Sequence, residues 1–344
     1  MAQLKAGSTV GGQTIATEGP AVVPTASLTI SGTKVFGSYV VVKNGELQYI
    51  PLSGELQVGF AAGGETPTYV TTIDKFPFTA PFTTATSAGS LSQARGYVAG
   101  QSSSAEGFTS GGVFPYVATI DKYPFTASFT TAASAGSLSQ ARAYVAGQSS
   151  STEGFTSGGA NPGVIPSRLS TIDKFPFSAP FTTATSAGSL SQARSSAAGQ
   201  SSTTEGFTSG GGIPSSATID KFPFSAPFTT ASSAGSLSQA RNPVTGQSSP
   251  TEGFTSGGSP SQRIDRFPFS APFTTATNVG SLSQTRTDIA GQSSFTSGYS
   301  SGGYTIPTGS LSTIDSFPFT APFTTATNVG ALSQARSGAA GHQY

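Results

Sequence analysis

A repeated segment constrains the fold of this chain more than any other feature. The pair Ile-Asp occurs six times, at intervals of 47, 52, 47, 45 and 50 residues, and each pair opens a block that reads IDKFPF or a close variant. A TTATSAGSLSQAR-like segment follows each block, and five blocks continue into GQSS and a GFTSGG-like segment. Six copies of one unit indicate repeated supersecondary units that bury their apolar faces against one another.

The period and the strand signals predict an all-β fold. A repeat of about 40–50 residues with short alternating segments is typical of a β-propeller, in which each repeat is one four-stranded blade. Within one unit we expect a first strand at RSSAAG (194–199), a second at EGFTSGG, a third at STIDKFPF and a fourth within FTTATSAGSLS. The Gly pair after the second strand permits a tight turn. Helical periodicity is absent.

The two ends of the repeat array complement each other. The last copy stops after ALSQARSGAAGHQY, so it has a first strand and no second strand, whereas LQVGFAAGG at 56–64 supplies a second strand before the first Ile-Asp pair. Pairing the two pieces removes the exposed edges of an open array. We therefore predict a six-bladed propeller over residues 56–344, closed by N- and C-terminal strands, with repeats starting near 73, 120, 172, 219, 264 and 314.

Residues 1–55 lack the repeat and are expected to form a short β-rich arm. VVVK and ELQYI flank Asn44-Gly45, a dipeptide that favours a type I′ hairpin turn. A segment of this size is too short to bury a sizeable core alone. We therefore expect the arm to be stabilised by docking.

The composition argues against several functional classes. The chain has no Cys and one His, His342, so thiol chemistry is excluded and most His-dependent catalysis and metal binding are disfavoured. The net charge of +1 gives no electrostatic argument for nucleic-acid binding. No apolar run reaches the ~20 residues of a membrane span. We expect a non-enzymatic protein with no cofactor and no membrane insertion.

One acid and one base recur in every repeat. Groups that occur once per blade are expected to form structural Asp–Arg pairs within or between blades, because partly buried charges need partners. A ring of calcium sites is the less favoured alternative, since calcium wants several clustered oxygen ligands. The acids are Asp74, Asp121, Asp173, Asp220, Asp265 and Asp315, and the bases are Arg95, Arg142, Arg194, Arg241, Arg286 and Arg336.

Two further sets of residues break the symmetry of the repeats. Glu106, Glu153, Glu205 and Glu252 precede GF in four copies, and we expect them to be solvated charges in blade loops. The connections after the Gly pairs vary in length and sequence, and such loops on a rigid ring are where recognition normally occurs. Their candidate recognition residues are Tyr116, Arg168, Arg263 and Tyr304.

The repeat resembles that of the kelch propellers. The shared pattern is an Arg near the start of a blade, a Gly pair after the second strand and an acid on the third strand, here Arg194, Gly210-Gly211 and Asp220. The Trp of that family is absent and its usual Tyr is not in place, so the Phe of FPF would fill the same space between blades. The resemblance implies a fold and no particular activity.

The opening MAQLKAGSTVGG and the repeat type also resemble those of bacteriophage virion structural proteins. This resemblance implies a tail-fibre or capsid-decoration protein in the virion, with other virion proteins as partners and self-association on the particle. In that role the arm would dock on the particle and the propeller would face outward, toward a host-surface glycan. The alternative is a secreted or surface lectin-like adhesin that binds glycans through Tyr and Asn or Gln side chains.

Overall fold

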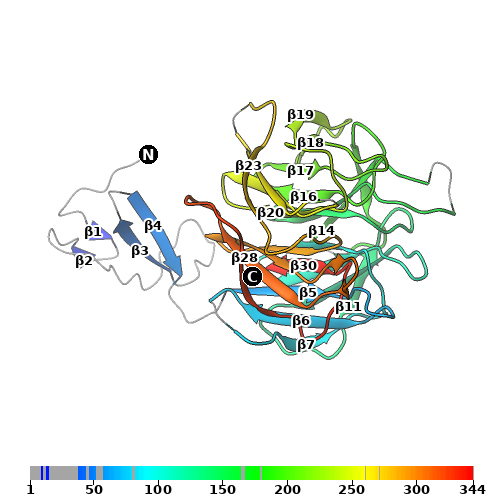
Figure 1. Cartoon of the computed structure of the whole chain (residues 1–344), viewed down its shortest axis with the longest axis horizontal. Helices are drawn as coiled ribbons and strands as arrows, with labels where there is room; N and C mark the ends of the chain where they lie inside the picture. The colour runs from blue at the N-terminus through cyan, green and yellow to red at the C-terminus, as the bar shows by residue number, and fades with distance from the viewer. Residues whose placement is uncertain are drawn as a thin grey trace. The chain divides into compact units, whose positions relative to one another are not determined.

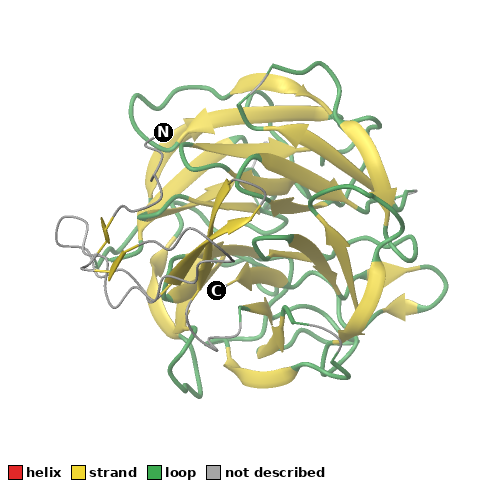
Figure 2. Ribbon diagram, turned by 90° about the vertical axis from the view of Figure 1, so that its left-hand side faces the viewer, coloured by secondary structure: helices red, strands yellow, loops and turns green. Residues whose placement is uncertain are grey.

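The chain forms two compact units, residues 1–56 and 57–344, described here from a computed structural model. The described residues are 9–10, 13–14, 38–43, 46–51, 57–79, 82–163, 167–178, 180–259, 261–270 and 272–343. Strands and loops make up all of the described structure (Figure 2). No helix in these ranges is long and apolar enough to cross a membrane.

The first unit contains two antiparallel strand pairs. β1 (Thr9–Val10) pairs with β2 (Gln13–Thr14), and β3 (Ser38–Lys43) pairs with β4 (Glu46–Pro51). Lys43 lies opposite Glu46 across a two-residue connection. The two strands of the predicted hairpin are therefore confirmed, whereas its Asn44-Gly45 turn lies outside the described residues.

The second unit consists of six four-stranded antiparallel sheets, which confirms the predicted six-bladed propeller. Blade I is β30 (Ala340–Gln343), β5 (Val58–Ala62), β6 (Thr72–Pro77) and β7 (Thr86–Ser90). Blade II is β8 (Ala99–Ser102), β9 (Glu106–Ser110), β10 (Thr119–Pro124) and β11 (Ala133–Ser137). Blade III is β12 (Ala146–Ser149), β13 (Glu153–Ser157), β14 (Thr171–Pro176) and β15 (Thr185–Ser189).

The remaining blades repeat this order from the innermost strand outward. Blade IV is β16 (Ala198–Ser201), β17 (Glu205–Ser209), β18 (Thr218–Pro223) and β19 (Ser232–Ser236). Blade V is β20 (Thr245–Ser248), β21 (Glu252–Ser256), β22 (Arg263–Pro268) and β23 (Thr277–Ser281). Blade VI is β24 (Ala290–Ser293), β25 (Ser297–Ser301), β28 (Thr313–Pro318) and β29 (Thr327–Ala331).

Blade I joins the two ends of the propeller sequence, as predicted. β30 pairs with β5, with His342 opposite Phe60, and β5 pairs in turn with β6. Figure 1 shows the red β30 beside the blue β5. The edge that each incomplete piece would expose is therefore covered.

The predicted first strand at 194–199 is wrong by about four residues. In blade IV the innermost strand is β16, which begins at Ala198, and Arg194 lies in the connection that precedes it. Ala198 and Gln200 face the interior of the blade, so a polar side chain occupies a buried strand position. Gln200 Nε2 donates to the Phe254 carbonyl oxygen and the Thr255 hydroxyl of blade V. Its burial is thereby compensated, although hydrophobicity alone does not reveal the strand.

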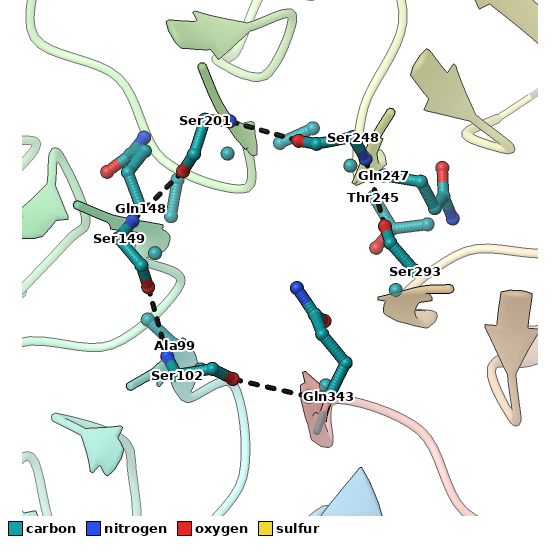
Figure 3. A pocket seen from close by; sticks show the side chains of 18 of the residues that line it. Ala99, Ser102, Gln148, Ser149, Ser201, Thr245, Gln247, Ser248, Ser293 and Gln343 are labelled. Carbon is teal, nitrogen blue, oxygen red and sulfur yellow. Dashed lines mark hydrogen bonds between the residues drawn. The ribbon is translucent and has the colours of Figure 1, made fainter. Parts of the chain in front are cut away.

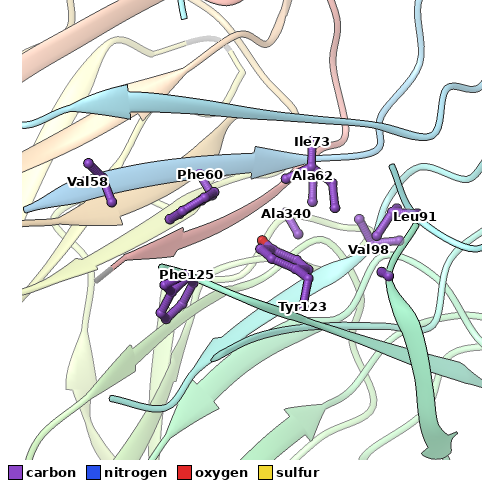
Figure 4. Close-up of a cluster of buried hydrophobic side chains, with 10 residues drawn as sticks. Val58, Phe60, Ala62, Ile73, Leu91, Val98, Tyr123, Phe125 and Ala340 are labelled. Atoms are coloured by element: carbon purple, nitrogen blue, oxygen red, sulfur yellow. The ribbon is translucent and has the colours of Figure 1, made fainter. Parts of the chain in front are cut away.

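The hydrophobic core lies between neighbouring blades. Between blades I and II, Phe60 packs against Tyr123 and Phe125, with ring centroids 5.8 and 5.1 Å apart, beside Leu91 (Figure 4). Equivalent clusters join the other blades, so the expectation that the aromatic residues of FPF pack between blades is confirmed. Each fully buried Phe contributes about 1.5–3 kcal/mol.

Glycine lets the six innermost strands approach closely. A Cβ on Gly147 of blade III would lie 2.2 Å from the Gly100 carbonyl oxygen of blade II, far inside van der Waals contact. The same conflict of 2.0–2.3 Å recurs at the equivalent glycine of every blade. The GQ pair of the repeat therefore sets how tightly the strands surround the axis. The glycines are Gly100, Gly147, Gly199, Gly246, Gly291 and Gly341.

Strand direction divides the connections between two faces of the propeller. The connections from second to third strands, such as 111–118, lie on the same side as the connections between blades, such as 138–145. We call this side the loop face. The turns from first to second strands, such as 103–105, lie on the opposite side, the hairpin face.

Candidate functional site

The recurrent acids and bases come together in six buried ion pairs. In each blade the Arg of the incoming connection reaches the Asp of the third strand, at N···O distances of 3.0–3.3 Å. All twelve residues are at most 1% exposed. The pairs are Arg95–Asp121, Arg142–Asp173, Arg194–Asp220, Arg241–Asp265, Arg286–Asp315 and Arg336–Asp74.

Each pair also holds the connection between two blades. Asp220 accepts hydrogen bonds from the Ser191 backbone N–H and hydroxyl, and Arg194 donates to the Thr208 carbonyl oxygen. Burial lowers the pKa of Arg194, and the nearby Asp220 carboxylate opposes that shift. These contacts leave the pair enclosed by protein, so its geometry is that of a structural element.

The recurrent glutamates occupy positions that differ from the prediction. Glu106, Glu153, Glu205 and Glu252 begin their second strands and are not loop residues. Each pairs across the sheet with a cation on the third strand, at 2.7–3.3 Å. These cations are Lys122, Lys174, Lys221 and Arg266. Blade VI has Ser297 and Ser316 at the two positions, so both members of the pair are replaced together.

A central cavity of about 720 Å³ follows the propeller axis. Its wall is built from the Ala, Gly and Ser of the innermost strands, and no charged side chain is found among its described lining residues. The backbone N–H of Ser102 donates to the Ser149 hydroxyl, and the same bond links Ser149 to Ser201, Ser201 to Ser248 and Ser248 to Ser293. Blade I has Gln343 at this position, and Figure 3 shows its side chain turned into the opening.

The four predicted recognition residues stand on four different blades and do not form one site. Tyr116 belongs to the connection of blade II and Arg168 to that of blade III, and both are half-buried. Arg263 is exposed but begins strand β22, so the prediction that it lies in a loop is wrong. Tyr304 lies in a small hairpin of β26 (Tyr304–Thr305) and β27 (Gly309–Ser310) and is 42% exposed. All four lie at the loop face.

The loop face also carries most of the exposed large apolar side chains. Phe114, Ile213 and Ile306 are 74%, 67% and 84% exposed, and each precedes a proline in the connection of blade II, IV or VI. Phe295 on the hairpin face is the other strongly exposed large apolar residue in the described ranges. The three residues of the loop face therefore stand on alternate blades of the ring.

The loop face carries an asymmetric group of residues of which only Tyr116 was predicted from the sequence. Tyr97 and Tyr144 follow the buried arginines of blades II and III, and their ring centroids lie 4.4 Å apart. Tyr97 donates a hydrogen bond of 2.8 Å to Glu65 Oε2. Tyr69 stacks on Phe114 with centroids 5.9 Å apart and an interplanar angle of 10°. We call Glu65, Tyr69, Tyr97, Tyr116, Tyr144 and Asp288 the tyrosine cluster.

The tyrosine cluster is electrostatically negative. The pKa of Asp288 is raised to about 6, mainly because burial disfavours the carboxylate, while the hydrogen bond from Thr287 opposes the shift and Glu65 adds to it. The pKa of Tyr144 is raised to about 12, mainly because burial disfavours the charged form, and the neighbouring Tyr116, Tyr69, Asp288 and Glu65 contribute to the same shift. In the described residues neither Glu65 nor Asp288 forms an ion pair with a Lys or Arg.

A signal for this cluster was present in the sequence. The two residues after each buried Arg vary, although the Ser-Gln pair that precedes the Arg and the Gly five residues after it recur in all six copies. The second of the two has a positive φ, between 53° and 65°, in five of the six copies. The variation therefore places different side chains at one mouth of the axis. The residues at this second position are Tyr97, Tyr144, Ser196, Pro243, Asp288 and Gly338.

The single histidine does not contribute to either face. His342 is fully buried between blades I and II, where its Nε2 lies 2.8 Å from the Phe108 carbonyl oxygen. The described residues also contain no group of three or more His, Asp or Glu that could hold a metal ion.

No protein family model matches the chain, and no curated protein matches its sequence. Membership of the kelch family therefore stays a prediction.

Proposed function

We propose that the protein is a non-enzymatic binding and display protein whose propeller presents its loop face to a partner. The observation that carries this proposal is the contrast between the two parts of each repeat. The ion pairs, the glycines and the aromatic residues between blades recur around the ring, whereas the connections on the loop face differ from blade to blade. A rigid scaffold with variable loops on one face is typical of recognition proteins.

The resemblance of the repeats and of the opening segment supports a place in a bacteriophage virion, as a tail-fibre or capsid-decoration protein. Gln57, where the propeller begins, and β30, where it ends, both lead to the hairpin face. Attachment through residues 1–55 would therefore leave the loop face available. Under this proposal the partners are other virion proteins, further copies of the chain and a host-surface molecule.

Mass spectrometry and immunogold labelling of purified particles test the virion assignment. We expect the full chain to be present in particles at a fixed copy number and to lose incorporation when residues 1–55 are deleted. Loop exchanges at 160–170 or 304–312 should leave incorporation unchanged. A chain that is secreted, absent from particles and bound to cell-surface glycans would instead favour the lectin-like adhesin.

A further inference from the structure

Two acids of the propeller differ from all the others. Residues 57–344 contain twelve Asp and Glu residues, and ten of them form the ion pairs described above. Within the described ranges, Glu65 and Asp288 form no ion pair. They come from sequence positions more than 200 residues apart. Backbone hydrogen bonds bring them into the tyrosine cluster: Glu65 exchanges two with Ser337, and the next residue, Gly338, donates its N–H to the Asp288 carbonyl oxygen.

Aromatic rings gather around the same two acids. Residues 57–344 contain eight tyrosines, and four of them, Tyr69, Tyr97, Tyr116 and Tyr144, belong to the cluster. Phe114, stacked on Tyr69, adds a ring that is 74% exposed. The cluster therefore combines π-faces with unpaired carboxylates at one mouth of a ring whose other acids are neutralised.

A bound cation would relieve an unfavourable arrangement in this cluster. Glu65 disfavours ionisation of Asp288, and the hydrogen bonds from Tyr97 and Thr287 are the polar contacts that the two carboxylates receive from side chains. Like charges that are partly removed from water need a counter-charge. Aromatic faces attract cations as well, most effectively when the cation is weakly hydrated.

The residues of the cluster favour one class of ligand over two others. A divalent metal ion prefers six or more oxygen ligands, whereas here two carboxylates stand among rings. A neutral sugar would hydrogen-bond to the carboxylates but would leave their mutual repulsion uncompensated. An ammonium group that carries methyl groups is weakly hydrated, so it can pack against the aromatic faces and also neutralise the carboxylates.

We propose that the tyrosine cluster binds a methylated ammonium group, as found in choline. The site deepens the proposed binding role of the loop face and rests on that role, but it does not depend on the virion assignment. Tyr97, Tyr144 and Tyr69 would supply ring faces, and Asp288 and Glu65 would supply the counter-charge.

Titration of the full chain with choline chloride tests this proposal. Isothermal titration calorimetry gives the affinity, and tyrosine fluorescence gives a second readout because the chain contains no Trp. The matched probe is 3,3-dimethylbutan-1-ol, which has the shape of choline without its charge, and sodium chloride controls for ionic strength. We expect choline to bind at least about tenfold more tightly than the neutral alcohol.

Substitutions in the cluster and matched controls distinguish the loss of a binding group from a general effect on the fold. Asp288→Asn removes the charge and keeps a residue that tolerates the positive φ of 53° at this position. It should lower choline affinity about tenfold, and Tyr144→Leu should lower it comparably. The controls are Phe295→Ala, an exposed aromatic residue on the hairpin face, and Glu106→Gln, an acid paired with Lys122. Both controls should bind choline as the unmodified chain does.

The outcomes distinguish this site from the proposed function. Equal affinity for choline and the neutral alcohol, unchanged binding by a folded Asp288→Asn variant, or preferential binding of a neutral monosaccharide would each overturn the cation site. Normal incorporation of Asp288→Asn into particles would leave the virion assignment intact in all these cases. Phosphatidylcholine vesicles and a trimethyl-lysine peptide then distinguish a lipid from a protein as the source of the group.

Discussion

The imidazole Nδ1 of His342 lies 2.9 Å from the hydroxyl oxygen of Tyr123, at the interface between the composite blade and its neighbour. His342 stands where the other blades have a buried Gln, and Tyr123 stands where they have Phe. Because His342 Nε2 donates to the Phe108 carbonyl oxygen, its Nδ1 carries a lone pair and accepts from the tyrosine hydroxyl. The two residues that depart from the repeat, His342 and Tyr123, are therefore hydrogen-bond partners of each other.

This relationship predicts a coupled effect on stability. Tyr123→Phe restores the residue of the repeat but leaves Nδ1 unpaired and buried, so it should destabilise the protein by about 1–3 kcal/mol. Adding His342→Gln should recover part of that loss. Urea denaturation of both single variants and the double variant measures the coupling. Additive effects of the two substitutions would contradict the pairing.

His342 should also make stability depend on pH. Its pKa is lowered from 6.5 to about 4, mainly because burial disfavours the charged ring, while the hydrogen bond to Phe108 opposes the shift. The unfolded chain then binds a proton that the folded chain does not, so stability is complete above about pH 6.5 and falls toward pH 4, by about 3 kcal/mol. The unfolding free energy of the unmodified chain minus that of His342→Gln/Tyr123→Phe should fall by this amount between pH 7 and pH 4. A constant difference would contradict the assignment.

The buried ion pairs should be sensitive to loss of one partner. Arg194→Ala leaves Asp220 buried without its counter-charge and removes the bond to Thr208, so we expect a loss of about 3–5 kcal/mol. Arg168→Ala, at a half-buried loop-face position, is the control and should change stability by less than about 0.5 kcal/mol. Thermal and urea unfolding of both variants measure the effect, and equal stabilities would refute the structural role.

Removal of the last strand tests closure. A chain ending at Ala339 lacks β30, so β5 becomes an unpaired edge and the axial contact of Gly341 with Gly291 is lost. We expect aggregation or loss of a cooperative melt, measured by circular dichroism and size-exclusion chromatography. A chain that lacks only Tyr344 is the control. A cooperative melt at the original temperature after the larger truncation would show that closure is dispensable.

The raised pKa of Asp288, about 6, predicts that choline binding strengthens as pH rises. Below this value the carboxyl group is largely neutral, and above it the carboxylate carries the charge that a bound cation needs. Affinity should increase several-fold between pH 5 and pH 7 and then level off. In Asp288→Asn this increase should be absent. Calorimetry across this range provides the measurement, and an identical profile in the variant would exclude Asp288 as the titrating group.

The repeat predicts the number of blades and the closure of the ring. It predicts neither the exact boundaries of the strands nor the members of the tyrosine cluster. Blade number follows from counting Ile-Asp pairs, and closure follows because residues 58–62 supply the strand that the last copy lacks. The start of β16 was misplaced because Gln200 is buried through hydrogen bonds and carries no hydrophobic signal. The tyrosine cluster combines residues from Glu65 to Asp288, and only the curvature of the ring brings such distant positions together.

The composite blade has a consequence for how the number of blades in this fold can change. Two specialised contacts join blade I to its neighbours. His342 bonds to Tyr123 of blade II, and the Tyr299 hydroxyl of blade VI donates to the Phe78 carbonyl oxygen of blade I. Blades III, IV and V share the common side chains at these positions. A change in the number of these central blades would leave both specialised contacts in place. The pairing of β30 with β5 and the two specialised contacts thus determine closure, whereas blades III, IV and V are the ones whose number can change.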